Sequence, residues 1–173
     1  MTKTVILDGA RTAFGKMGGS LASLTASDLG GVAIKEALNR AGVAPESVDE
    51  VIMGTVLQAG QGQIPSRQAA TKAGIPWGVK TETINKVCAS GMRAVTLADQ
   101  LIRLGDEETI VAGGMESMSN APYYLPKGRF GLRMGDAQMI DGMIYDGLSC
   151  SFDPKRVHMG TYGNATAEKF DLS

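Results

Sequence analysis

Short segments rich in β-branched and apolar residues alternate along the chain with longer segments of helical spacing. The short segments predict strands at residues 4–7, 51–56, 81–85 and 109–112. Between them, apolar residues recur every three or four positions and predict helices over 28–41, 67–73 and 88–104, the first with Asp28 as its N-cap. A glycine follows each of these helices closely and is the typical residue at a helix end.

The alternation of strands with helices predicts an α/β fold with a mainly parallel sheet. The apolar run 4–7 is expected to be a buried strand, and helix 88–104 is expected to be largely buried because its polar residues form only a narrow stripe. From Ser119 the chain has prolines, glycines and aromatic residues but no clear strand pattern. We therefore predict an α/β domain over 1–118 and part of an irregular loop domain over 119–173.

One segment of this second part is amphipathic, with Met139, Ile140, Met143 and Ile144 on one face. A further helix is expected to begin near Asn164 and to continue through the last residues.

The composition excludes several classes of protein. Acidic and basic residues nearly cancel, 18 against 17, so no basic surface for nucleic acid is expected. No apolar run approaches the roughly 20 residues of a membrane span, and the N-terminal run is too short for a signal peptide. Cys88 and Cys150 are the two cysteines, too few for a disulfide scaffold and without the spacing of a zinc site. We expect a cytoplasmic protein with free thiols.

Cys88 stands between the predicted strand 81–85 and the predicted helix 88–104. The unpaired N–H groups and the dipole at a helix N-terminus favour an anion, and hence the reactive thiolate. The small residues that follow, Ala89 to Gly91, leave room for a substrate to approach the backbone. The residue type alone leaves open a second interpretation, a buried and inert cysteine.

Five segments resemble the motifs of one family, and they occur in the family's order. The segment Asn85-Lys86-Val87-Cys88-Ala89-Ser90-Gly91-Met92-Arg93-Ala94 resembles the nucleophile signature of the thiolases. The family's N-terminal motif and its third marker are similar to 11–16 and 112–119, and segments 134–136 and 158–160 are similar to parts of its loop domain. The resemblance covers essentially the whole chain.

The resemblance implies a thiolase-like N-terminal domain and acyl transfer between coenzyme A thioesters, within fatty acid metabolism. Cys88 would carry the acyl group, and its backbone N–H would contribute to an oxyanion hole. Leu148, His158 and Met159 match positions that line the pantetheine and acyl pocket, and the His-Met pair favours the conversion of two acetyl-CoA molecules to acetoacetyl-CoA and coenzyme A. The family binds no cofactor or metal, and a full-length member would form a homodimer or homotetramer.

The family's activating His, water-positioning Asn and second catalytic Cys come from its C-terminal half, and no residue here matches them. We therefore expect an N-terminal portion that is inactive alone, with Cys150 as a loop thiol without a catalytic role. Four alternatives stay open. They are a 3-ketoacyl-CoA thiolase for longer chains, a ketoacyl synthase, a hydrolase-like pair of Cys88 with His158 as base, and a non-catalytic structural or interaction module.

Overall fold

The computed structural model describes residues 3–172, which divide into two compact units, the first ending at Asn120 and the second beginning at Ala121. The first unit contains three helices, three strands and two short 3₁₀ turns. In chain order they are α1 (Ala26–Ala41), η1 (Pro45–Ser47), β1 (Glu50–Gly54), α2 (Pro65–Lys72), β2 (Lys80–Ile84), α3 (Ser90–Leu104), β3 (Ile110–Gly114) and η2 (Met118–Asn120).

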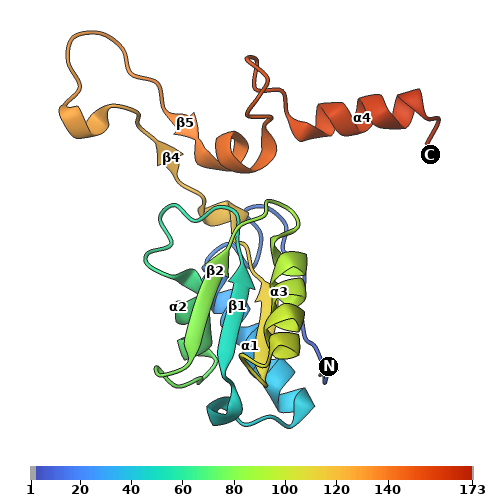
Figure 1. Ribbon diagram of the computed structural model, residues 1–173. Coiled ribbons are helices and arrows are strands. Elements are labelled where there is room, and N and C mark those ends of the chain that lie inside the picture. Colours follow the sequence, from blue (N-terminus) through green and yellow to red (C-terminus); the bar gives the residue numbers. More distant parts are fainter. Residues whose placement is uncertain (1–2, 173) are drawn as a thin grey trace. The chain divides into compact units, whose positions relative to one another are not determined.

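The three strands of the first unit form one parallel sheet in the order β2-β1-β3. Val51 of the central strand lies opposite Thr81 on one side and Val111 on the other. Figure 1 shows β1 between its two neighbours, with all three arrows pointing the same way. The predicted α/β fold with a parallel sheet is thereby confirmed.

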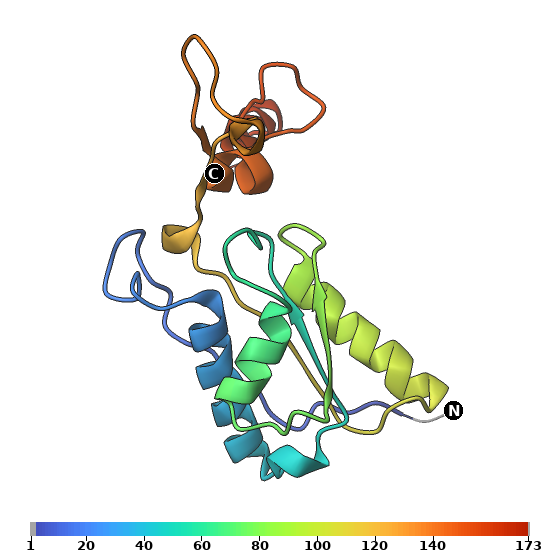
Figure 2. The same cartoon turned by 90° about the vertical axis from the view of Figure 1, so that its left-hand side faces the viewer.

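Helices cover both faces of this sheet. Figure 2 shows α1 and α2 on one face and α3 on the other. The alternation of side chains along β1 explains the arrangement, since successive residues of a strand point to opposite faces. Val51 and Met53 belong to the apolar cluster under α1 and α2, whereas Ile52 packs with Ala94 and Ala98 of α3. Val51 and Ile52 are both 0% exposed, so the central strand is covered on both sides.

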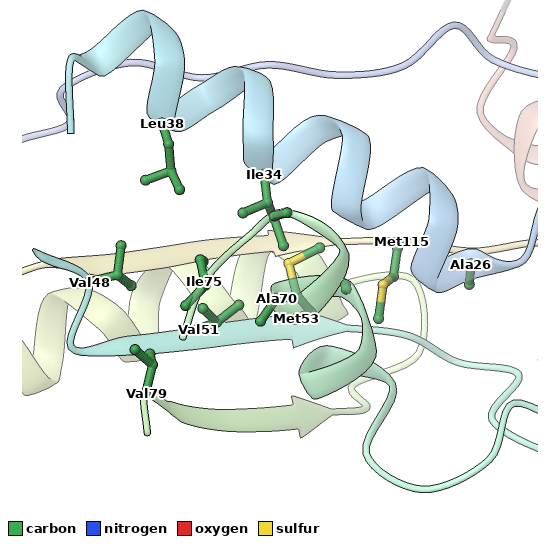
Figure 3. Close-up of a cluster of buried hydrophobic side chains, with 12 residues drawn as sticks. Ala26, Ile34, Leu38, Val48, Val51, Met53, Ala70, Ile75, Val79 and Met115 are labelled. Atoms are coloured by element: carbon green, nitrogen blue, oxygen red, sulfur yellow. The ribbon is translucent and has the colours of Figure 1, made fainter. Parts of the chain in front are cut away.

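The larger cluster lies between the sheet and the pair α1 and α2 (Figure 3). Ile34 and Leu38 point from α1 toward the sheet, and Ile75 and Val79 close the cluster from the segment before β2. Burying one large aliphatic side chain contributes roughly 1.5–3 kcal/mol, so this cluster is the main source of stability in the unit.

The N-cap of helix α1 lies three residues before its predicted position at Asp28. The N-cap is Thr25, whose hydroxyl accepts a hydrogen bond from the Asp28 N–H, and the Asp28 carboxylate accepts one from the Thr25 N–H. Asp28 is therefore the third helical residue of a capping box, and the prediction that it is the N-cap was wrong. Its carboxylate also forms an ion pair with Lys72 of α2. The helix ends at Gly42, whose φ of 66° is the left-handed conformation that glycine adopts without strain.

Residues 4–7 do not form the buried strand that their apolar character predicted. Val5, Ile6 and Leu7 are 65%, 83% and 63% exposed, and the segment belongs to no strand of the described sheet. Hydrophobicity alone does not make a strand, because the backbone must find a neighbouring strand to bond with.

Helix α3 is also less buried than predicted. Its contact face consists of Ser90, Ala94 and Ala98, spaced four residues apart, while Met92 and Leu104 are 69% and 75% exposed. Apolar residues do occur all around the helix, but within residues 3–172 only those that face the sheet are buried.

The second unit has short elements. Its strands are β4 (Tyr123–Tyr124) and β5 (Ile140–Asp141), which pair in antiparallel fashion, and its other elements are η3 (Gly128–Phe130), a π-helical segment η4 (Met143–Leu148) and α4 (Met159–Lys169).

The amphipathic segment around Met139 to Ile144 is divided between β5 and η4. One expectation for this unit was wrong. Helix α4 starts five residues before Asn164 and ends at Lys169, before the last described residue. Across residues 3–172, no helix combines the length and the apolar character needed to cross a membrane.

Candidate active site

Cys88 lies at the carboxyl edge of the sheet, in the turn that joins β2 to α3. Strands β1, β2 and β3 all end at this edge because they run parallel. The helix begins at Ser90, two residues later than predicted, so Cys88 immediately precedes the N-cap residue Ala89. Cys88 is exposed in this structure, so it is not the buried cysteine of the alternative interpretation. Ligands of open α/β sheets bind at the carboxyl ends of the strands, where this thiol lies.

The turn before Cys88 is fixed by side-chain hydrogen bonds. Val87 has a φ of 50°, an uncommon conformation for a β-branched residue. Its N–H donates to the Asn85 side-chain oxygen at 2.9 Å, and its carbonyl accepts the Ser90 hydroxyl at 2.6 Å. The same hydroxyl oxygen accepts the Lys86 N–H at 2.8 Å. These bonds hold a strained backbone directly beside the thiol, an arrangement that is concentrated at functional sites.

Two glycines let α3 approach the strand ends. A side-chain carbon added at Gly54 would lie 2.4 Å from the carbonyl carbon of Ser90, and one added at Gly114 would lie 3.2 Å from the α-carbon of Gly91. Both glycines are the last residues of their strands, β1 and β3. At Gly54 only a residue without a side chain permits this contact, and at Gly114 a side chain would push α3 slightly away, so the strand ends help to fix where the start of α3, and with it Cys88, can lie.

The carboxylate of Glu116 accepts hydrogen bonds from residues 55–57, which follow β1. Its Oε1 accepts the Thr55 hydroxyl at 2.9 Å and the Leu57 N–H at 3.3 Å, and its Oε2 accepts the Val56 N–H at 2.8 Å. The Val56 carbonyl in turn accepts the Asn85 amide at 3.3 Å. Sequence reasoning did not single out Glu116 or Asn85 as individual residues, although both lie in segments that resemble family motifs.

The other predicted site residues, Leu148, His158 and Met159, all lie in the second unit. Leu148 is half-buried at the end of η4, and Met159, 49% exposed, is the first residue of α4. His158 is exposed and caps α4, its Nδ1 accepting the Gly160 N–H at 3.0 Å. A single β-bridge joins His158 to Ser149, the neighbour of Leu148. The structure therefore brings these three residues into one region of their unit, and their role in a pocket stays a prediction.

Cys150 is half-buried and free, and its N–H donates to the Val157 carbonyl. In residues 3–172, no three His, Cys, Asp or Glu side chains gather closely enough to hold a metal ion. At the sheet edge, the described residues place the exposed Cys88 in a hydrogen-bonded turn.

The sequence of this chain is similar to those of known proteins. Residues 4–173 match the family of thiolase N-terminal domains. The chain is 55% identical over 173 residues to the acetyl-CoA acetyltransferase of Cupriavidus necator, covering all of this chain and 44% of that protein. It is 51% identical to the Pseudomonas aeruginosa protein of the same name over 173 residues, with the same coverage. It is 48% identical over 171 residues to that of Schizosaccharomyces pombe, covering 99% of this chain and 43% of the relative.

The chain thus spans less than half the length of these curated relatives. The match nevertheless extends from residue 4 to residue 173 and includes residues of both units, in agreement with the parallel sheet. The chain belongs to the thiolase family, whose N-terminal domain it contains.

Proposed function

We propose that the protein containing this chain is an acetyl-CoA C-acetyltransferase that converts two acetyl-CoA molecules to acetoacetyl-CoA and coenzyme A through an acyl-cysteine at Cys88. The observation that carries the proposal is the exposed thiol in its hydrogen-bonded turn at the carboxyl edge of the sheet. The relatives of 48–55% identity, all named acetyl-CoA acetyltransferases, favour acetyl-CoA as the substrate.

In the first half-reaction, the Cys88 thiolate attacks the carbonyl carbon of acetyl-CoA. A new sulfur–carbon bond forms to Cys88 as the bond to the coenzyme A sulfur breaks, and coenzyme A leaves and takes up the proton that the Cys88 thiol gave up. The Cys88 N–H is one proposed donor to the oxyanion formed on the way. In the second half-reaction, the methyl carbon of another acetyl-CoA loses a proton and forms a carbon–carbon bond to the acetyl group, the bond from that group to the Cys88 sulfur breaks, and the proton returns to the Cys88 thiolate.

A mass-spectrometric experiment on the whole protein that contains this chain tests for the acyl-cysteine intermediate. The protein is mixed with acetyl-CoA, quenched in acid and digested, and the peptide containing Cys88 is searched for the added mass of one acetyl group. Cys150→Ser is the matched control, because it removes the other thiol of this chain. We expect acetylation of Cys88 in the wild type and in Cys150→Ser, and neither acetylation nor turnover in Cys88→Ser. Retained turnover in Cys88→Ser would contradict the proposal.

The substrate is tested separately. Turnover of acetoacetyl-CoA with coenzyme A is compared with that of long-chain 3-ketoacyl-CoA and of acetyl groups carried on acyl carrier protein. A preference for acetoacetyl-CoA supports the proposal. A preference for the long chain favours the 3-ketoacyl-CoA thiolase, and a preference for the carrier protein favours a ketoacyl synthase. The pocket role of Leu148, His158 and Met159, the cytoplasmic location and the homo-oligomeric state stay predictions.

A further inference from the structure

We propose that Glu116 is a positioning residue for Cys88, acting through residues 55–57 and the side chain of Asn85. The proposal rests on the proposed function, because it concerns the orientation of the thiol that would be acylated. Glu116 itself lies just beyond β3, while Cys88 follows β2, and hydrogen bonds through the loop after the central strand β1 link the two.

The first step is the attachment of the loop to Glu116. The carboxylate takes part in three hydrogen bonds with residues 55–57, and both of its oxygens are used. Thr55, only 1% exposed, also donates its N–H to the carbonyl of Ile84, the last residue of β2. The half-buried carboxylate therefore accepts hydrogen bonds from the first residues after β1 and holds them beside the end of β2.

The second step leads from the loop to the turn. The Val56 N–H donates to Glu116, and the Val56 carbonyl accepts the amide of Asn85. The Asn85 side-chain amide has a nitrogen that donates and an oxygen that accepts. Because its nitrogen donates to the Val56 carbonyl, its oxygen is placed to accept the Val87 N–H. That last bond holds Val87 at a φ of 50°, immediately before Cys88.

The carboxylate is the chemical group that this arrangement requires. It accepts hydrogen bonds with both oxygens, whereas an amide has one oxygen and one nitrogen that only donates. In Glu116→Gln, a donor of the 55–57 segment must therefore face the amide nitrogen. The loop can then shift, and Asn85 loses its fixed acceptor. A misplacement of about 1 Å at a reacting group can lower the rate about a hundredfold.

The test measures the rate of Cys88 acetylation at saturating acetyl-CoA, together with KM, in the protein as its gene encodes it. We expect Glu116→Gln to slow acetylation about a hundredfold with KM changed less than about threefold, because Glu116 positions the nucleophile and does not meet the substrate. Glu46→Gln is the matched control, since Glu46 is exposed in η1, before β1. It should acetylate at the wild-type rate.

A double-mutant cycle separates positioning from a general loss of structure. If Glu116 acts through Asn85, the double variant Glu116→Gln with Asn85→Ala should be no slower than the slower single variant. Multiplicative losses would overturn the proposal, as would wild-type acetylation in Glu116→Gln. Should Glu116→Gln fail to fold, Asn85→Ala alone breaks the link while leaving the carboxylate intact, and a wild-type rate in that variant also overturns the proposal.

A second reaction keeps this inference separate from the proposed function. Alkylation of Cys88 by iodoacetamide needs no acetyl-CoA, and Cys150 of the same molecule is the internal reference. We expect Glu116→Gln to change the alkylation rate of Cys88 and its pH profile, with Cys150 unchanged. If Cys88 is never acetylated but shows this change, the proposed function fails and the positioning role stands. If acetylation occurs and neither reaction responds to Glu116→Gln, the positioning role fails.

Discussion

The two units of the chain are built in different ways. All buried apolar side chains of residues 3–172 lie between Ala26 and Met115, in the first unit. That unit pairs strands of five residues and covers them with helices on both faces. The second unit pairs strands of only two residues, and large side chains such as Phe130 and Phe152 are 83% and 96% exposed.

Local polar contacts take the place of a core in the second unit. Tyr124 donates its hydroxyl to Asp146, Tyr162 donates to Asp153, and the Arg156 guanidinium lies 3.5 Å from the centre of the Tyr145 ring. A hydrogen bond contributes about 1 kcal/mol net, whereas each buried large aliphatic side chain contributes roughly 1.5–3 kcal/mol. The comparison teaches that the first unit determines the stability of the chain, while contacts in the second fix local conformations.

The largest effect is expected from a deletion in the core of the first unit. Ile52 is 0% exposed and packs against α3, so Ile52→Ala removes buried methyl groups and leaves a cavity. We expect a loss of about 2–5 kcal/mol in the free energy of unfolding. Chemical denaturation followed by circular dichroism measures the loss, and hydrogen exchange of individual peptides assigns it to a unit.

Ile144→Ala in the second unit is the matched control for this deletion. The same atoms are removed, but Ile144 is 36% exposed and the surroundings are not a closed core. We expect a loss of about 1 kcal/mol or less, confined in hydrogen exchange to residues after 120. Equal losses in the two variants would contradict the difference between the units.

The patterns that are local in sequence predicted the first unit well. The strand at Val51, the helix that ends at Gly42 and the thiol at a strand–helix junction were all recognised, because hydrophobic spacing and capping residues act over a few positions. The N-cap was predicted at Asp28, three residues after its true position at Thr25, because element ends are the least reliable part of a sequence-based prediction.

The errors concern features that depend on distant residues. The apolar run 4–7 was taken for a strand, but a strand requires a partner that its own sequence does not specify. Glu116 contacts Thr55, 61 positions away, and no spacing rule connects them. The second unit was the least predictable, because its few buried positions leave no periodic pattern to read.

An effect of intermediate size is expected from the ion pair that joins α1 to α2. Hydrogen bonds from Lys72 and Thr25 lower the pKa of Asp28 from 3.8 to about 2. Asp28 therefore binds a proton more readily in the unfolded chain than in the folded one. The stabilisation from its ionised carboxylate is fully present above the unfolded pKa of 3.8 and is lost as the pH falls toward 2. Since the Asp28 side chain is 35% exposed, solvent screening limits its contribution to about 1 kcal/mol.

Asp28→Asn should thus lower the free energy of unfolding by about 1 kcal/mol at neutral pH and flatten its dependence on pH between about 4 and 2. Denaturation curves at several pH values measure both effects. Asp136→Asn in the second unit is the control, because Asp136 is exposed and its side chain has no hydrogen bond within the described part of the chain. An unchanged pH slope in Asp28→Asn would show that this ion pair does not stabilise the contact of α1 with α2.

The smallest effect on stability, and the most specific test of the second unit, concerns Tyr124. Its hydrogen bond to Asp146 raises the pKa of Tyr124 from 10.0 to about 12, because the bond holds the phenol in its protonated form. Because the pKa of Tyr124 is higher in the folded than in the unfolded state, the hydrogen bond contributes to stability at pH values below the unfolded pKa of 10.0. This contribution is lost as the pH rises through about 12. In Asp146→Asn, the pKa of Tyr124 should fall toward 10 while the free energy of unfolding at neutral pH changes by less than about 0.5 kcal/mol.

Nuclear magnetic resonance of tyrosines labelled at the ring carbon that bears the hydroxyl follows this titration residue by residue. Asp153→Asn is the matched control, since it removes the partner of Tyr162, whose pKa is also raised to about 12, and should leave Tyr124 unchanged. If Asp146→Asn instead lowers stability as much as Ile52→Ala, the polar contacts of the second unit carry global stability and the contrast between the units is wrong. If it shifts Tyr124 alone, β4 and η4 are held together by a bond that fixes conformation and adds little to stability.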